Sequence, residues 1–384
     1  MRIVRARSAA VVAVGDLARS PRMLNHAREL ARAGWHVWAI GFREREFDVP
    51  SGVRVHVLLG PRSGAGPYSR RWFLVSAGLR MGWISLALTA ALLRRRPEII
   101  LVQNPPSFPA LAAGWIAALL LGATLLIDWH NYGYTMLGLR LGRGHWFTRF
   151  AARYEGWMAR RADLHFCVSD GMRADLEQRF GVRAGVLYDR PLDNPDGVET
   201  PPSAPLVAVC ASSWTEDEDM ELLFDALELV DPRTFELYLT GDGPRRGGWE
   251  ARIVALRRTG WTIRAGFLSG GEYRALLRRA SLGLSLHRSS SGLDLAMKVV
   301  DLFGAGVPVC AFDYGTTVRE QIADRRTGFL FRTAAELAGI LAAIVDKPEL
   351  LVAMRHSIHQ QWTVTWADEW RRVAGAAFRV DDAA

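Results

Sequence analysis

Lysine is almost missing from this sequence of 384 residues, and cysteine is scarce. Only Lys298 and Lys347 are lysines among 48 basic residues, so nearly all of the positive charge is arginine. The three cysteines, Cys167, Cys210 and Cys310, lie among apolar residues and form no C-x-x-C pair. This pattern argues against a zinc site and a disulfide framework, and it fits a reducing cytosol.

Long uninterrupted apolar runs are also lacking. Residues 1–13 have arginines followed by an apolar stretch too short for a leader and its cleavage site, so we expect the first strand there. Residues 110–127 approach the ~20 apolar residues that cross a bilayer. Gly122 interrupts this run, and polar residues follow it directly. We predict a buried helix, a turn and a buried strand in this segment.

Acidic residues are few in the first half of the chain. Residues 1–190 hold 27 basic and 13 acidic residues (net +14), whereas residues 191–384 hold 21 and 27 (net −6), which gives the total of +8. A basic surface attracts nucleic acids, anionic lipids and diphosphates alike. No motif that reads nucleic acid accompanies it, so we expect no nucleic-acid partner.

Apolar strands and amphipathic helices alternate along two stretches of the chain, which predicts α/β domains with doubly wound, mostly parallel sheets. With 49% hydrophobic and 23% charged residues, the chain is long enough for two such cores. Five prolines interrupt the alternation. We predict a first domain at 1–190, a linker at 191–205, a second domain at 206–355, and a C-terminal helix at 356–384 that packs back toward the first domain. Three tryptophans recur in that last segment at helical spacing, Trp362, Trp366 and Trp370.

Two polar loops follow predicted strands of the first domain. Gly15 and Asp16 precede a helix that starts at Ser20-Pro21, and the amides of a helix start attract a phosphate or an oxyanion, although an ordinary capped turn is the alternative. The loop lacks G-x-G-x-x-G, which counts against a dinucleotide dehydrogenase. Residues 128–134 read Asp-Trp-His-Asn-Tyr-Gly-Tyr. Their His130 could act as a base or hydrogen-bond partner, and aromatic rings suit sugars, although a histidine after a strand is often structural.

Residues 289–304 are the most informative stretch of the second domain. A Ser/Gly loop leads into a helix, where free amides and hydroxyls could hold a diphosphate and Lys298 would add a point charge. Lys298 and Asp301 share a helix face, which suits a cation on phosphate and a carboxylate on ribose. The alternative is a surface ion pair between them. Gly241 and Gly243 either form a plain turn or let the backbone approach a ligand.

Residues 215–219, Thr-Glu-Asp-Glu-Asp, also follow a predicted strand. Thr215 and Glu218 match a capping box at the start of a helix predicted from Thr215. Residues 217–219 formally match D-x-D, a metal-binding pattern. Because successive helical residues point in different directions, we favour the cap over a metal site.

Taken together, these motifs resemble the chitobiosyldiphosphodolichol beta-mannosyltransferase family, a GT-B family of lipid-linked oligosaccharide assembly. The resemblance runs in order over nearly the whole chain. It comprises Gly-Asp-x-x-Arg-Ser-Pro-Arg-Met at 15–23, Gln-Asn-Pro-Pro at 103–106, Ile-Asp-Trp-His-Asn-Tyr-Gly-Tyr at 127–134, Ser-Trp-Thr-Glu-Asp-Glu-Asp at 213–219, and Ser-Ser-Ser-Gly-Leu-Asp-Leu-x-Met-Lys-Val-Val-Asp at 289–301. It implies the GT-B fold, in which two Rossmann-like doubly wound parallel-sheet domains face a central cleft that binds the substrates.

The resemblance implies an inverting beta-1,4-mannosyltransferase that moves mannose from GDP-mannose to a lipid diphosphate-linked acceptor containing GlcNAc, without a metal cofactor. We expect Asp16 to be the base and His130 to contact the mannose. The expected donor-binding residues are Gly15, Ser212, Ser213, Trp214, Gly241, Gly243, Phe267, Ser290, Ser291, Gly292, Leu293, Asp294, Lys298 and Asp301. The expected acceptor-binding residues are Arg19, Asn104, Asn131, Tyr132 and Tyr134. Many GT-B relatives have an Arg and a Lys where this sequence has Ser213 and Glu218, so its diphosphate would rely on hydroxyls, helix amides and Lys298.

Eukaryotic members begin with a membrane-spanning anchor that has no counterpart in this sequence. We therefore expect a cytoplasmic enzyme held peripherally on the cytoplasmic face of an anionic membrane. Apolar residues on a basic-flanked helix could contact that membrane or belong to the core, namely Trp72, Phe73, Trp83 and Ile84. Two alternatives stay open. One is a GT-B enzyme that uses another nucleotide sugar in exopolysaccharide or lipopolysaccharide assembly, and the other is a catalytically silent GT-B scaffold.

Overall fold

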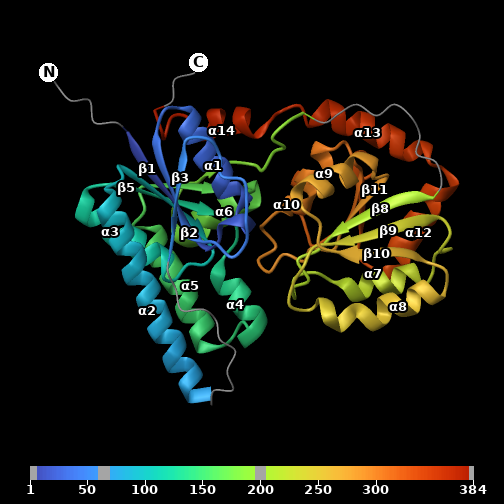
Figure 1. Cartoon of the computed structure of the whole chain (residues 1–384), viewed down its shortest axis with the longest axis horizontal. Helices are drawn as coiled ribbons and strands as arrows, with labels where there is room; N and C mark the ends of the chain where they lie inside the picture. The colour runs from blue at the N-terminus through green and yellow to red at the C-terminus, as the bar shows by residue number, and fades with distance from the viewer. Residues whose placement is uncertain (1–6, 59–69, 195–204, 380–384) are drawn as a thin grey trace. The chain divides into compact units, whose positions relative to one another are not determined.

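The chain divides into two compact units in the computed structural model, which describes residues 7–58, 70–194 and 205–379 (Figure 1). The first unit comprises Met1–Tyr188 and Glu369–Ala384, and the second comprises Asp189–Asp368. Each unit contains one parallel sheet, so the prediction of two parallel-sheet α/β domains is confirmed. Most of the predicted linker, residues 195–204, lies outside the described residues.

The sheet of the first unit has the strand order β3-β2-β1-β4-β5-β6-β7. Every strand pairs in parallel with its neighbours. Its central strands are buried almost along their full length, as strands covered by helices on both faces must be. The strands are β1 Ser8–Asp16, β2 His36–Phe42, β3 Val53–Val57, β4 Ile99–Asn104, β5 Thr124–Trp129, β6 Leu164–Cys167 and β7 Gly185–Val186.

The helices of the first unit are the 3₁₀ turn η1 Leu17–Arg19, α1 Pro21–Arg32, α2 Arg70–Arg95, α3 Ala110–Leu121, α4 Gly133–Leu141, α5 Trp146–Ala159 and α6 Asp170–Phe180. Helix α1 begins at Pro21, as the Ser20-Pro21 signal predicts, whereas α4 begins at Gly133, within the predicted polar loop. Gly122 ends α3 in the left-handed conformation, and β5 follows, as predicted for residues 110–127. However, α3 is not fully buried, because Leu119 and Leu120 are exposed.

The second unit repeats this architecture with the strand order β10-β9-β8-β11-β12-β13. Its strands are β8 Leu206–Ala211, β9 Phe235–Thr240, β10 Thr262–Gly266, β11 Leu282–Ser285, β12 Val309–Phe312 and β13 Gly328–Phe331. Its helices are α7 Met220–Leu227, η2 Arg246–Trp249, α8 Glu250–Arg258, α9 Gly270–Arg279, α10 Met297–Gly304, α11 Val318–Gln321, α12 Ala334–Asp346 and α13 Glu349–Gln361. The last helix, α14 Trp366–Ala374, begins in this unit and ends in the first.

Two expectations about helices were wrong. The helix predicted from Thr215 begins only at Met220, because Asp219 is its N-cap and accepts a hydrogen bond from Leu222 N. The C-terminal segment forms two helices, α13 and α14, rather than one. Thr365 and Asp368 exchange side-chain to backbone hydrogen bonds that start α14 anew.

The helix proposed to contact a membrane is α2. Its Trp83 is exposed, whereas Ile84 is buried, so the predicted apolar set does not share one environment. The side chains of Trp72 and Phe73 lie outside the described residues. Within the described part of the chain, no helix combines the length and the apolar character needed to cross a bilayer.

Successive strands are added toward one edge of each sheet and then toward the other, and this change occurs between β1 and β4 and between β8 and β11. Loops that leave the carboxyl ends of such strand pairs diverge to opposite faces of the sheet, and ligands of doubly wound sheets bind there. These two switch points are therefore where functional side chains are expected.

Candidate active site

Asp16 lies at the switch point of the first unit, at the end of β1. Its Oδ1 accepts hydrogen bonds from Ala18 N and Glu44 N, both at 3.2 Å. Its Oδ2 is buried and has no hydrogen-bond partner among the described residues. The carboxylate therefore binds the amide of Ala18, one of those that the sequence suggested would be free. Its Oδ2 accepts no hydrogen bond from the described residues.

Asp128 is the centre of a buried polar network at the end of β5. Arg22 forms a bidentate ion pair with it, Nε to Oδ2 at 2.7 Å and Nη2 to Oδ1 at 2.9 Å. Nε2 of His26 lies 3.2 Å from Oδ2, and Nε2 of His130 lies 2.8 Å from the same oxygen. Burial raises the pKa of Asp128, but the Arg22 charge and the two histidine contacts outweigh burial and hold that pKa well below its usual range. Asp128 is therefore ionised at neutral pH, and it orients His130.

His26 links this network to the C-terminal helix. Its Nδ1 accepts the indole N–H of Trp370, at 3.0 Å. A neutral His26 must then carry its proton on Nε2, which donates to Asp128. Burial lowers the pKa of His26 despite the neighbouring Asp128 carboxylate, which favours this neutral form.

Glu155 organises the loops that follow β4 and β5. It accepts hydrogen bonds from Ser107 Oγ at 2.7 Å and from the backbone N–H of Tyr134 at 2.8 Å. Asn104 donates to the carbonyl of Asn131 at 3.0 Å and more weakly to Glu155. Burial raises the pKa of Glu155 to about 7, although these hydrogen bonds favour its ionised form.

The predicted acceptor-binding residues occupy different environments. Asn104 is fully buried and Tyr132 is 1% exposed, with its hydroxyl donating to Asp175 at 2.8 Å, so both side chains support the loop. Asn131 is also buried, and its Oδ1 accepts from Tyr132 N. Tyr134 is half-buried and stacks on Tyr132, while Arg19 is exposed.

Lys298 and Glu218 form an ion pair at the switch point of the second unit. Glu218 also accepts hydrogen bonds from Ser213 N at 2.8 Å and Trp214 N at 2.9 Å, and Ser212 Oγ donates to it. Glu218 therefore folds the loop after β8 around its own carboxylate. The alternative of a surface ion pair between Lys298 and Asp301 was wrong, because Lys298 pairs with Glu218.

The residues of the D-x-D pattern contact different basic groups. Asp217 contacts Nδ1 of His287 at 3.5 Å, and Asp219 pairs with Arg288. A backbone hydrogen bond from Arg288 N to Asp217 O holds the two loops together at 2.7 Å. The predicted capping box of Thr215 with Glu218 is absent from this described segment, because Glu218 lies in the loop ahead of α7.

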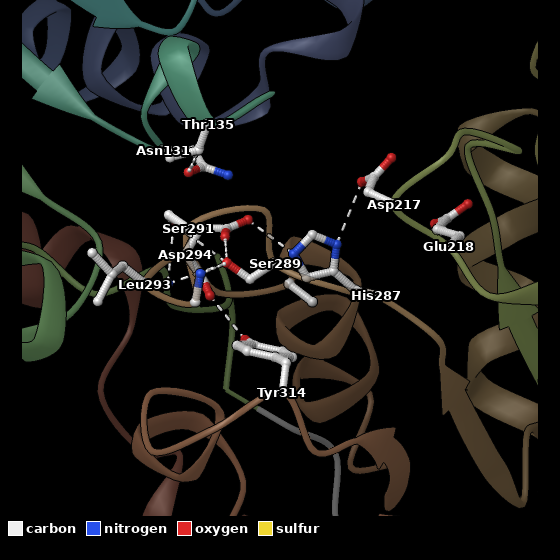
Figure 2. Close-up of polar contacts among 12 residues, drawn as sticks. Asn131, Thr135, Asp217, Glu218, His287, Ser289, Ser291, Leu293, Asp294 and Tyr314 are labelled. Atoms are coloured by element: carbon white, nitrogen blue, oxygen red, sulfur yellow. Dashed lines mark hydrogen bonds and ion pairs between the residues drawn. The ribbon is translucent and has the colours of Figure 1, made fainter. Parts of the chain in front are cut away.

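His287 lies between two carboxylates in the loop after β11 (Figure 2). Its Nε2 is 2.8 Å from Asp294 Oδ2. Burial lowers the pKa of His287, but the Asp294 charge and the hydrogen bonds to Asp217 and Asp294 outweigh burial and raise the pKa to about 10. His287 is therefore a cation at neutral pH, and it pairs with Asp294 in the loop just before α10.

The Ser/Gly loop before α10 is closed by its own hydroxyls (Figure 2). Ser289 Oγ accepts from Gly292 N at 2.7 Å and from Leu293 N at 3.1 Å, and Ser291 Oγ also accepts from Leu293 N. These amides are thus not free, contrary to expectation. The start of α10 differs, since its N-cap Ala296 provides no side-chain hydrogen bond. Ser290 is buried and Asp301 is exposed.

The glycines after β9 are explained by the approach of the chain's own backbone. A Cβ on Gly241 would lie 2.0 Å from Ser212 O, and one on Gly243 would lie 1.8 Å from Ser213 O. Trp214, expected to contact the donor, is fully buried in the core of the second unit. Phe267, after β10, is exposed.

Sequence reasoning missed several residues that organise both switch points. Arg22 and Asp128 lie within the motifs at 15–23 and 127–134, but neither was given a role. The spacing of Trp370 predicted a helix and not its contact with His26, and no local pattern marks Glu155. His287 could have been found, because it follows a strand of the second sheet at the same switch point as Ser212.

Comparisons with known proteins cover nearly the whole chain. Residues 20–187 match the family described as Glycosyl transferase 4-like domain, and residues 204–347 match the Glycosyl transferases group 1. A chitobiosyldiphosphodolichol beta-mannosyltransferase of Mus musculus is 32% identical over 96% of this chain and 88% of its own length. A protein of Arabidopsis thaliana named UDP-glycosyltransferase TURAN is 31% identical over 95% of this chain and 96% of its own.

The fold agrees with that of a solved glycosyltransferase structure. Sucrose-phosphate synthase from Thermosynechococcus elongatus superposes with a TM-score of 0.74 at 17% identity, covering 97% of this chain and 98% of the other. At this identity the match supports the GT-B fold and nothing finer. The sequence matches, not the fold, therefore identify the family.

Proposed function

The chain belongs to the chitobiosyldiphosphodolichol beta-mannosyltransferase family of GT-B glycosyltransferases, and from this premise we propose that it transfers mannose from GDP-mannose to a lipid diphosphate-linked acceptor containing GlcNAc. The observation that carries the proposal is the match to relatives of this name along nearly all of the chain. We propose a beta-1,4 linkage formed with inversion at the anomeric carbon.

The second unit supplies the proposed donor site. Lys298 stands in the first turn of α10, where the N-cap provides no side-chain hydrogen bond. Its ammonium group pairs with Glu218, and we propose that it turns to the diphosphate when the donor binds at this helix end. Asp301 is exposed one turn further along the helix and is proposed to bind the ribose hydroxyls. His287 holds Asp294 beside this site.

The first unit supplies the proposed chemistry. The acceptor hydroxyl oxygen forms a bond to the anomeric carbon of mannose, the bond from that carbon to the diphosphate oxygen breaks, and GDP leaves with the electron pair. The hydroxyl proton goes to Asp16, whose Oδ2 is its unused oxygen. His130, oriented by Asp128, contacts the mannose. We propose that Lys298 and the α10 amides stabilise the leaving diphosphate without a metal ion.

The lipid-linked acceptor places the proposed reaction at a membrane. We propose that the enzyme works peripherally on the cytoplasmic face and that anionic lipid attracts its arginine-rich first half, residues 1–190 with a net charge of +14 (27 basic minus 13 acidic). Arg19 and Tyr134 are proposed to meet the acceptor sugars, because they are less buried than Asn104 and Tyr132.

A second donor class has specific support. One relative of similar identity is named a UDP-glycosyltransferase. Competition between GDP-mannose and UDP-sugars for the same site separates the two donors. If GDP-mannose is the donor, UDP-sugars should displace labelled GDP-mannose only at high concentration.

The decisive experiment measures transfer of labelled mannose from GDP-mannose to phytanyl-diphosphate chitobiose in the presence of EDTA. Lys298→Ala is compared with Lys347→Ala, the other lysine of the chain, which is exposed after α12. Product that persists in EDTA and in Lys347→Ala but is lost in Lys298→Ala supports the proposal. Absence of product from the wild-type enzyme, despite clear binding of GDP, would overturn the proposed acceptor.

A further inference from the structure

The tip of the helical hairpin formed by α4 and α5 is strongly apolar. The two helices pack side by side in the first unit (Figure 1). Six large apolar side chains are exposed there, with Trp146 at 67% and Phe150 at 57%. The set is Met136, Leu139 and Leu141 in α4, and Trp146, Phe147 and Phe150 in α5, and we call it the hairpin tip.

The hairpin tip is held in shape by contacts beneath it. Thr148 is buried and donates its hydroxyl to Gly142 O at 3.1 Å, which fixes the turn between the helices. His145 accepts from Phe147 N and caps α5. Phe147 and Phe150 stack with their planes 10° apart. The turn and the start of α5 are therefore fixed by hydrogen bonds, and the exposed rings extend from this ordered segment.

The charged side chains within residues 129–154, the hairpin segment, have one sign. Arg140, Arg143, Arg149 and Arg153 are all exposed. No aspartate or glutamate occurs between Asp128 and Glu155, and both of those carboxylates are buried. Exposed apolar side chains that alternate in sequence with exposed arginines match the interface of an anionic bilayer, where rings enter the acyl boundary and guanidinium groups meet phosphates.

We propose that the hairpin tip docks this enzyme on a bilayer surface that carries anionic lipid. The proposal deepens the proposed function, on which it rests for the lipid nature of the acceptor. A second copy of the chain is a poorer occupant, because a two-fold contact would bring the four arginines of each copy together without opposing carboxylates.

A rival surface exists on α2, where Leu79, Trp83 and Leu86 are exposed at helical spacing. Residues 49–97 also contain no acidic residue. The hairpin tip is favoured because its arginines and its aromatic rings are both exposed, whereas Arg80 beside the α2 stripe is half-buried. The test therefore includes both surfaces.

The test measures binding of the full-length protein to phosphatidylcholine vesicles with and without phosphatidylglycerol. The tip variant carries Trp146→Ser, Phe147→Ser and Phe150→Ser. Its matched control carries Leu192→Ser, Leu229→Ser and Val254→Ser, three exposed apolar residues of the second unit. We expect the tip variant to bind anionic vesicles at least about tenfold more weakly than wild type, and the control to bind equally.

The charge component is tested separately. Arg140→Ser with Arg143→Ser should weaken binding by roughly fivefold per arginine and reduce its dependence on salt. Arg274→Ser with Arg278→Ser, exposed on α9, changes the net charge equally and should have little effect. Melting temperatures confirm that all variants fold.

Three outcomes overturn the proposal. The tip variant could bind anionic vesicles like wild type, or Leu79→Ser with Trp83→Ser and Leu86→Ser could abolish binding while the tip variant retains it. The tip variant could instead become monomeric from a dimeric wild type with unchanged vesicle binding. If wild type binds vesicles through the tip but transfers no mannose to the embedded acceptor, the docking surface stands and the proposed function fails.

Discussion

Trp370 donates its indole N–H to Nδ1 of His26 at 3.0 Å, although 344 residues separate the two in sequence. His26 in turn contacts Asp128, and Asp128 contacts His130. The C-terminal helix α14 is therefore part of the structure that orients a proposed active-site histidine, and not only a closing element of the fold.

Trp370→Phe should lower kcat by roughly fivefold with little change in KM for GDP-mannose. Phenylalanine keeps the stacking on Phe378 but removes the hydrogen bond, which is worth about 1 kcal/mol. His26 could then adopt the other tautomer and release Asp128. Trp366→Phe is the control, since Trp366 is a fully buried tryptophan of the same helix, α14, one turn earlier. Equal losses in both variants would indicate a packing effect only.

Asp128→Asn should destabilise the first unit by about 3 kcal/mol, because Arg22 would remain buried without its carboxylate. The exposed pair of Asp170 with Arg173 gives a matched control, since Asp170→Asn should cost less than about 1 kcal/mol. The folded-state pKa of Asp128 is depressed. Its contribution is therefore complete above the unfolded value of about 3.9 and is lost as the pH falls below it. Thermal melting from neutral to acidic pH measures both effects, and identical profiles for wild type and Asp128→Asn would contradict the assignment.

Asp16→Asn should reduce transfer by at least about 100-fold and leave GDP affinity unchanged, because the amide cannot accept the acceptor proton. The remaining carbonyl oxygen can still accept the Ala18 and Glu44 amides. Single-turnover kinetics measure the loss of transfer, and calorimetry measures the affinity for GDP. Normal turnover in the variant would remove Asp16 from the role of base and leave His130 as the next candidate.

His287→Gln should destabilise the second unit most strongly at low pH. The folded-state pKa of His287 is raised to about 10, above its unfolded value of about 6.5. The stabilisation is therefore complete below pH 6.5 and disappears as the pH rises through 10. We expect a deficit of about 3 kcal/mol at pH 6 that narrows toward pH 10. A deficit independent of pH would mean that His287 is not charged between Asp217 and Asp294.

Gly243→Ala should destabilise the second unit by about 3 kcal/mol, because the added methyl group would overlap the carbonyl oxygen of Ser213. Gly247→Ala is the control, since a Cβ there meets nothing within 4 Å. Chemical denaturation of the two variants gives the comparison. If Gly243→Ala were as stable as the control, the loops after β8 and β9 would not be packed as described.

The sequence alone determined the two parallel-sheet domains, because periodic apolar strands and capped helices are local signals. It also determined the family, because long motifs such as residues 289–301 lie in a fixed order. It placed Asp16 and Ser212 at the carboxyl ends of strands and Lys298 in the helix after the Ser/Gly loop, where the structure has them. Local alternation and the order of the motifs along the chain were enough for these inferences.

Only the tertiary structure decided which groups pair. It set Glu218 against Lys298, 80 residues apart, and made Asp217–Asp219 a loop instead of a helix start. It also brought Trp370 to His26 and turned the rings of Trp146 and Phe150 outward. Ion pairs and burial depend on which segments meet when the sheets form, and local sequence patterns carry no information about a partner tens or hundreds of residues away.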